Sequence, residues 1–140
     1  MVKNLSYNSK KIKTLLTEVV GRPLSLTERF KLRGIGSNKL VITDASKEIV
    51  ELLRLDNNIN YCNIEIRKNG IIIRFRSLLE TYGLIIPFYK LVIYKGESKI
   101  YSFYKDRHYV KCFVDNENST LFIKKVIRLK TVYLKEMGLN

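Results

Sequence analysis

Apolar side chains in the first third of the chain recur at helical spacing. Over positions 12–19 they follow the i, i+3, i+4, i+7 pattern of an amphipathic helix, which Ser9 can cap at its start. Ser25 stands three residues before Glu28, which is the spacing of a capping box. We therefore predict a first helix after Ser9 and a short second helix over about 26–33.

The clearest pattern in the chain is an alternation of apolar and polar residues over positions 61–67 that returns over 71–77. Asn69-Gly70 lies between the two runs and is typical of a type I′ turn, so the sequence predicts a β-hairpin. The register that this turn fixes gathers the apolar residues on one face. On the other face it places Glu65 directly opposite Arg74, as an ion pair.

Strand-like composition continues beyond this hairpin. Residues 84–94 are rich in β-branched and aromatic side chains. A second hairpin is predicted from 99–105 and 108–114, with its turn at Asp106-Arg107. The sequence therefore predicts a central antiparallel sheet of five or six strands over about 60–114.

Shorter elements complete the predicted fold. Residues 39–43 form a candidate short strand, and Asp44 is expected to cap a third helix. A C-terminal amphipathic helix over about 119–137 is expected to pack on the apolar face of the sheet. Lys130 falls within its apolar sector, either as an amine that reaches the rim or as a buried functional amine. We expect one α+β domain over residues 1–140, with N-terminal helices, the central sheet and this last helix.

The chain carries 26 Lys and Arg against 13 Asp and Glu, a formal net charge of +13. An excess of this size favours binding to anionic surfaces, because phosphates attract it without sequence preference. The expected partner is nucleic acid, an anionic membrane surface or an acidic protein. The same excess also fits a solvated coat on a small structural or protein-interaction domain with no nucleic-acid or lipid binding.

Two groups of cations are candidates for anion binding. They are Arg67, Arg74 and Arg76 on the outward face of the first hairpin, and Lys10, Lys11 and Lys13 in the first turn of the first helix. The helix dipole disfavours cations at that end of a helix, and a phosphate-bearing partner would remove the conflict. We expect the arginines to form the site and the lysines to add auxiliary charge.

Residue types that could perform catalysis are scarce. His108 is the single histidine and the carboxylates are scattered, so general acid–base catalysis has no visible motif. Cys62 and Cys112 are the only cysteines, and two cysteines with one histidine do not make a tetrahedral zinc site. We expect a non-enzymatic protein that holds no metal and no small-molecule cofactor.

The two cysteines lie inside strand-like runs and are expected to be buried, reduced thiols, although a single disulfide between them is also possible. The first residues lack the basic and then apolar pattern of a signal peptide. No apolar run approaches the roughly 18–20 residues of a membrane helix. A cytoplasmic protein is expected.

Several stretches resemble short uncharacterised bacterial proteins that have no assigned activity. They are residues 34–39, 57–65, 70–77, 79–82 and 86–90. In element order, strands closed by one long amphipathic helix over residues 60–137 are similar to bacterial pleckstrin-homology-like domains. This second resemblance implies binding of phospholipid or protein, and not catalysis.

Overall fold

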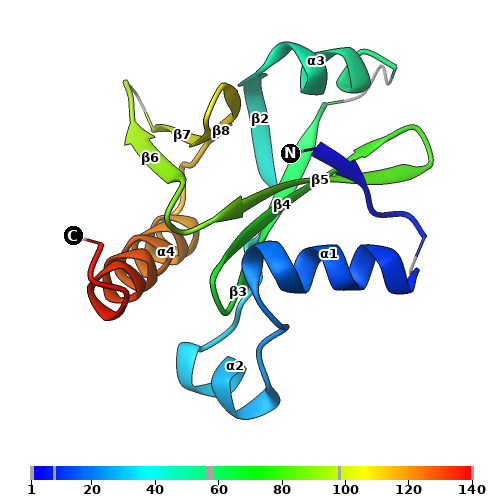
Figure 1. Cartoon of the computed structure of the whole chain (residues 1–140). Helices are drawn as coiled ribbons and strands as arrows, with labels where there is room; N and C mark the ends of the chain where they lie inside the picture. The colour runs from blue at the N-terminus through cyan, green and yellow to red at the C-terminus, as the bar shows by residue number, and fades with distance from the viewer. Residues whose placement is uncertain (1, 8, 56–58, 98, 140) are drawn as a thin grey trace.

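The computed structural model describes residues 2–7, 9–55, 59–97 and 99–139. Within these residues, four helices accompany one antiparallel sheet of eight strands, in the order β1-β5-β4-β3-β2-β8-β7-β6 (Figure 1). The strands are β1 (Val2–Asn4), β2 (Leu40–Ala45), β3 (Tyr61–Arg67), β4 (Gly70–Ser77), β5 (Glu80–Pro87), β6 (Leu91–Lys95), β7 (Ile100–Lys105) and β8 (His108–Phe113). The helices are α1 (Lys10–Val20), α2 (Leu26–Leu32), α3 (Lys47–Leu53) and α4 (Glu117–Glu136).

The α+β class and the antiparallel sheet are confirmed, but the prediction of five or six strands is wrong. Compared with the predicted sheet, the observed sheet also contains β1, which pairs with β5, and β2, which lies between β3 and β8. The part of the chain before residue 60 therefore mixes strands with helices. A strand as short as β1 shows no alternation of its own and is defined by pairing with a distant strand.

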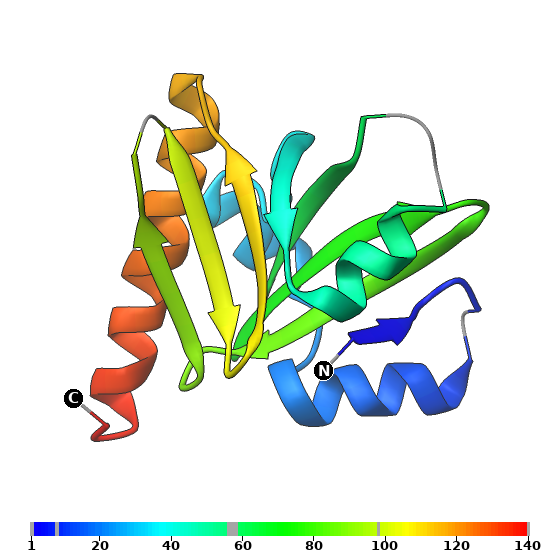
Figure 2. The ribbon, with the colours of Figure 1, turned by 90° about the horizontal axis from the view of Figure 1, so that it is seen from above.

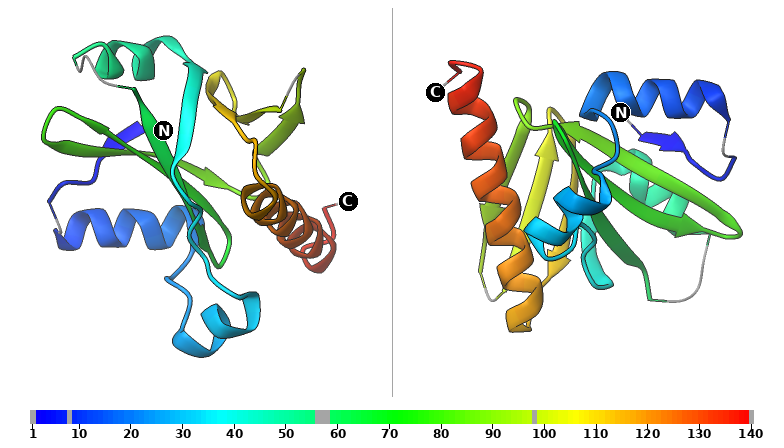
Figure 3. Two further views of the ribbon diagram at one scale, coloured as in Figure 1. Left: turned by 180° about the vertical axis from the view of Figure 1, so that it is seen from behind. Right: turned by 90° about the horizontal axis from the view of Figure 1, so that it is seen from below.

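The sheet has two faces that are covered differently. Its inner face carries one core that joins both halves of the sheet, and α3 and α4 pack into this core through Ile49 and Val126. On the outer face, α1 covers only part of the sheet, with Leu16 packed against Ile72 and Ile85. Figures 2 and 3 show α1 and α4 at opposite ends of the molecule. Among the described residues, no helix combines the length and the apolar character needed to cross a membrane.

The first hairpin forms, but its predicted register is wrong by two residues. Arg67 pairs with Gly70, so Lys68 and Asn69 make the turn. Gly70 is needed for close approach and not for a turn, because a Cβ there would lie 2.4 Å from the carbonyl oxygen of Ile86. A shift of two residues keeps each side chain on its predicted face. The second hairpin turns at Asp106-Arg107 as predicted.

Local signals at the helix ends are mostly confirmed. Ser9 accepts a hydrogen bond from the backbone of α1, and Ser25 forms the predicted capping box of α2 with Glu28. The prediction for Asp44 is wrong, because Asp44 lies in β2 and α3 begins after Ser46. The chain must first complete the pairing of β2 with β8, so the strand extends over the local capping signal.

Lys130 joins α4 to the sheet. Its amine donates a hydrogen bond to the carbonyl oxygen of Leu91 at the start of β6. Burial lowers the pKa of this lysine. The half-buried amine therefore has a defined structural partner inside the apolar sector of the helix.

Cys62 and Cys112 are free, buried thiols with their sulfur atoms 3.4 Å apart. The hydrogen bond between the thiols, together with burial, raises the pKa of Cys62. We expect a thiol reagent at pH 8 to label the native protein only as fast as it unfolds, because the thiolate is the reactive form. Protein unfolded in urea is the control and is expected to react at once. Rapid labelling of the native protein would contradict this arrangement.

The same raised pKa has a consequence for stability at alkaline pH. An unfolded cysteine loses its proton near pH 8.5, whereas the folded thiol keeps it. The contribution of Cys62 to stability is therefore complete below about pH 8.5 and declines as the pH rises towards the folded pKa.

Candidate functional site

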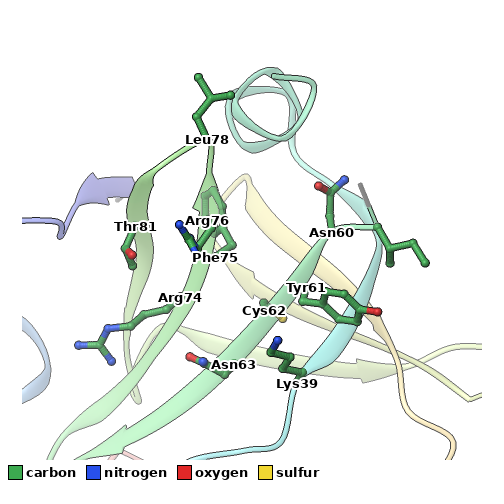
Figure 4. A pocket seen from close by; sticks show the side chains of 11 residues that line it. Lys39, Asn60, Tyr61, Cys62, Asn63, Arg74, Phe75, Arg76, Leu78 and Thr81 are labelled. Carbon is green, nitrogen blue, oxygen red and sulfur yellow. The ribbon is translucent and has the colours of Figure 1, made fainter. Parts of the chain in front are cut away.

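A cavity of about 630 Å³ opens on the outer face of the sheet, beyond the part that α1 covers (Figure 4). Its polar lining consists mainly of Lys39, Asn60, Tyr61, Asn63, Arg74 and Arg76. The described residues that line it include three cations and no carboxylate. An anion in this cavity would meet positive charge and amide groups together.

Strand alternation explains how these side chains come together. Asn63 of β3 lies directly opposite Arg74 of β4, so both side chains point to the outer face. Arg76 is two residues further along β4 and shares that face. Lys39 immediately precedes β2, and its amine lies 5.5 Å from the centre of the Tyr61 ring.

The cations of this cavity differ in how strongly the protein neutralises them. Arg74 forms an ion pair with Glu65. Arg76 and Lys39 are both exposed, and neither has an ion-pair partner within the described parts of the chain. Arg76 and Lys39 therefore carry most of the charge that a bound anion could use.

Glu65 binds two of the three arginines that the sequence placed in the site. Its carboxylate accepts a hydrogen bond from Nε of Arg67 at 2.6 Å and another from Arg74. Burial acts to raise the pKa of Glu65, but the charges and hydrogen bonds of Arg74 and Arg67 outweigh it and hold that pKa below its usual value. Arg67 is only 8% exposed and also donates to the backbone carbonyl of Gly21. Arg67 thus joins the end of α1 to the sheet and is withdrawn from solvent.

The three lysines of α1 do not act as one group. All are exposed, and Lys13 lines a second cavity, of about 490 Å³, together with Arg67 and Arg74. Lys10 and Lys11 line neither of these two cavities. The six candidates therefore divide between two cavities and a solvated helix end, with Arg74 lining both cavities.

Lys39 is the residue that sequence reasoning missed. Its place on the outer face follows from β2, in which Val41 lies opposite Tyr61 of β3, and Lys39 is two residues before Val41. The signal is therefore readable only once the pairing of β2 with β3 is known. The helical and hairpin patterns on either side gave no indication of that pairing.

The residue types suited to catalysis are not gathered in the described structure. Nδ1 of His108 lies 3.7 Å from a carboxylate oxygen of Glu48, and burial lowers the pKa of His108. Among the described residues, no group of three or more His, Cys, Asp or Glu side chains could hold a metal ion. The cationic cavity is therefore the feature on which a functional argument can be built.

No protein-family model, curated protein or solved structure matches the chain. These comparisons therefore give no information about its function. The residues of the cavity and the faces of the sheet around it are the features from which a function can be inferred.

Proposed function

We propose that the chain is a non-enzymatic module that binds a phosphate-bearing partner in the cavity on the outer face of the sheet. The observation that supports this most is the convergence of Lys39, Arg74 and Arg76 on a cavity whose described lining has no carboxylate. A guanidinium group can donate two parallel hydrogen bonds to a phosphate, and an ammonium group adds a point charge. The amides of Asn60 and Asn63 can donate further hydrogen bonds.

The rival is a structural or protein-interaction domain whose charge is only a solvated coat. Under that view, the positions of the cations have no role in binding. Because Lys39, which precedes β2, and Arg76 of β4 come from distant parts of the chain and line the same cavity, the geometry favours the binding module.

An acidic lipid surface is the second candidate partner. Exposed aliphatic side chains stand at and beside the rim of the cavity, with Ile59 66% exposed and Leu79 88% exposed. Aliphatic groups next to cations suit the boundary between lipid headgroups and acyl chains. The proposed similarity to pleckstrin-homology-like domains rests only on the order of β3 to β8 followed by α4.

Salt titration tests the proposed function. We expect a labelled single-stranded oligonucleotide, or vesicles containing acidic phospholipid, to bind at low salt and to be released as salt rises. Three phosphates neutralised on a single strand correspond to a log–log slope of about −2. Neutral vesicles are the control and are expected not to bind. If no anionic probe binds at low salt, the proposed function is wrong and the structural or protein-interaction domain remains.

A further inference from the structure

The outer face of β8, β7 and β6 has no helix packed on it within the described chain. Figure 2 shows α4 alongside β6 and β7, and the core contacts of α4 all lie on the inner face. On the outer face, Tyr94 is 61% exposed and Phe113 is 37% exposed. A contiguous exposed surface of large side chains is typical of an interaction site.

Strand pairing places aromatic rings along this face. They are Tyr61, Tyr94, Tyr104, Tyr109 and Phe113. Val41 of β2 lies opposite both Tyr61 and Phe113, so these two rings flank it in one row across the sheet. Tyr104 and Tyr109 are direct partners on neighbouring strands, with their ring centres 5.3 Å apart. Tyr94 lies on β6, at the edge of the sheet.

Lysine amines lie close to two of these rings. The amine of Lys39 lies 5.5 Å from the centre of the Tyr61 ring, and the amine of Lys111 lies 5.6 Å from the Tyr109 ring. Asp44 is paired opposite Lys111 and contributes a carboxylate to the face. The cationic cavity adjoins the row at Tyr61, so positive charge continues from the cavity onto the aromatic surface.

We propose that the partner is single-stranded nucleic acid, with phosphates at Lys39 and Arg76 and with bases stacked on Phe113 and Tyr94. This inference rests on the proposed function, because the cavity supplies the phosphate contacts. Rings with cations beside them suit a flexible single strand, since every base presents a flat face and every linkage carries a charge. Sequence preference is not required for this mode of binding.

The form of the surface favours a single strand over the other anionic partners. In a duplex, the bases are stacked inside the helix and cannot lie on the rings of the protein. Lipid acyl chains would gain from aliphatic groups, but on this face the exposed rings of Tyr94 and Phe113 outnumber the exposed aliphatic side chain of Val92. The aromatic face lies over other strands than the aliphatic rim of Ile59 and Leu79, and Lys111 lies among its rings.

Anisotropy titrations with the full chain test this inference. The probes are a labelled single strand of roughly 12 nucleotides, a duplex of the same sequence, and vesicles with acidic phospholipid. We expect Phe113→Ser and Tyr94→Ser each to weaken single-strand binding about tenfold, with the salt slope unchanged. The matched controls Phe113→Tyr and Tyr94→Phe keep a ring and are expected to stay within about twofold. Urea unfolding of each variant verifies that it is folded.

The outcomes separate this inference from the proposed function. If the single strand binds with the expected salt slope, but the two serine variants bind it as tightly as the wild type, the inference is wrong and the proposed function still holds. Equal affinity for duplex and single strand, or binding to the vesicles alone, would overturn it in the same way. If no anionic probe binds at low salt, the proposed function fails as well.

Discussion

Replacing Gly70 with alanine is expected to lower the free energy of unfolding by about 3 kcal/mol. The added Cβ would lie 2.4 Å from the carbonyl oxygen of Ile86 and 2.7 Å from a methyl group of Val20. The first of these is backbone of β5, so the strands or α1 must move apart. Unfolding in urea measures the loss as a lower midpoint with an unchanged slope.

Gly36→Ala is the matched control for this variant. A Cβ at Gly36 would meet no atom within 4 Å, and the change is expected to alter stability by less than about 0.5 kcal/mol. Equal losses in the two variants would show that the close approach of α1, β4 and β5 at Gly70 is not present in solution.

Glu65→Gln is expected to destabilise the protein by about 3 kcal/mol at neutral pH. The change leaves the buried guanidinium of Arg67 without its carboxylate partner at 2.6 Å. Because Arg74 and Arg67 hold the pKa of Glu65 below its usual value, the carboxylate stabilises the fold above its unfolded pKa. This contribution is lost as the pH falls through the folded pKa, so the wild type and the variant are expected to converge in acid.

A double variant separates charge burial from simple loss of packing. Glu65→Gln combined with Arg67→Met removes the unpaired buried charge and replaces it with an apolar chain of similar length. Urea unfolding at neutral pH is expected to show that the double variant is more stable than Glu65→Gln alone. The described role of Glu65 would be contradicted if Glu65→Gln lowered the free energy of unfolding by less than about 1 kcal/mol. It would also be contradicted if the double variant were no more stable than Glu65→Gln.

Local patterns were enough to predict the elements but not all of their partners. The capping box at Ser25 depends on neighbouring residues alone, and it forms. The hairpin register was misassigned because Asn69-Gly70 fits a two-residue turn, whereas packing against β5 and α1 determines where Gly70 must lie. β1 could not be predicted from three residues without knowing that β5 was available to pair with it.

The candidate site was predicted only in part, because local patterns show the face of a residue but not its distant neighbours. Alternation along β4 placed Arg74 and Arg76 on one face, which the register error did not disturb. Alternation alone could not show that Arg67 is buried, because burial depends on where α1 ends and on Glu65. It also could not find Lys39, whose position depends on β2 lying beside β3.

The most direct test of the account compares two double variants that each reduce the net charge of +13 by two. Lys39→Gln with Arg76→Gln alters the cavity, whereas Lys10→Gln with Lys11→Gln alters the exposed start of α1. Titration of each with the same labelled single strand at low salt is expected to show at least tenfold weaker binding for the cavity variant. The α1 variant is expected to bind nearly as the wild type does. Equal weakening in both would show that total charge, and not the cavity, governs binding.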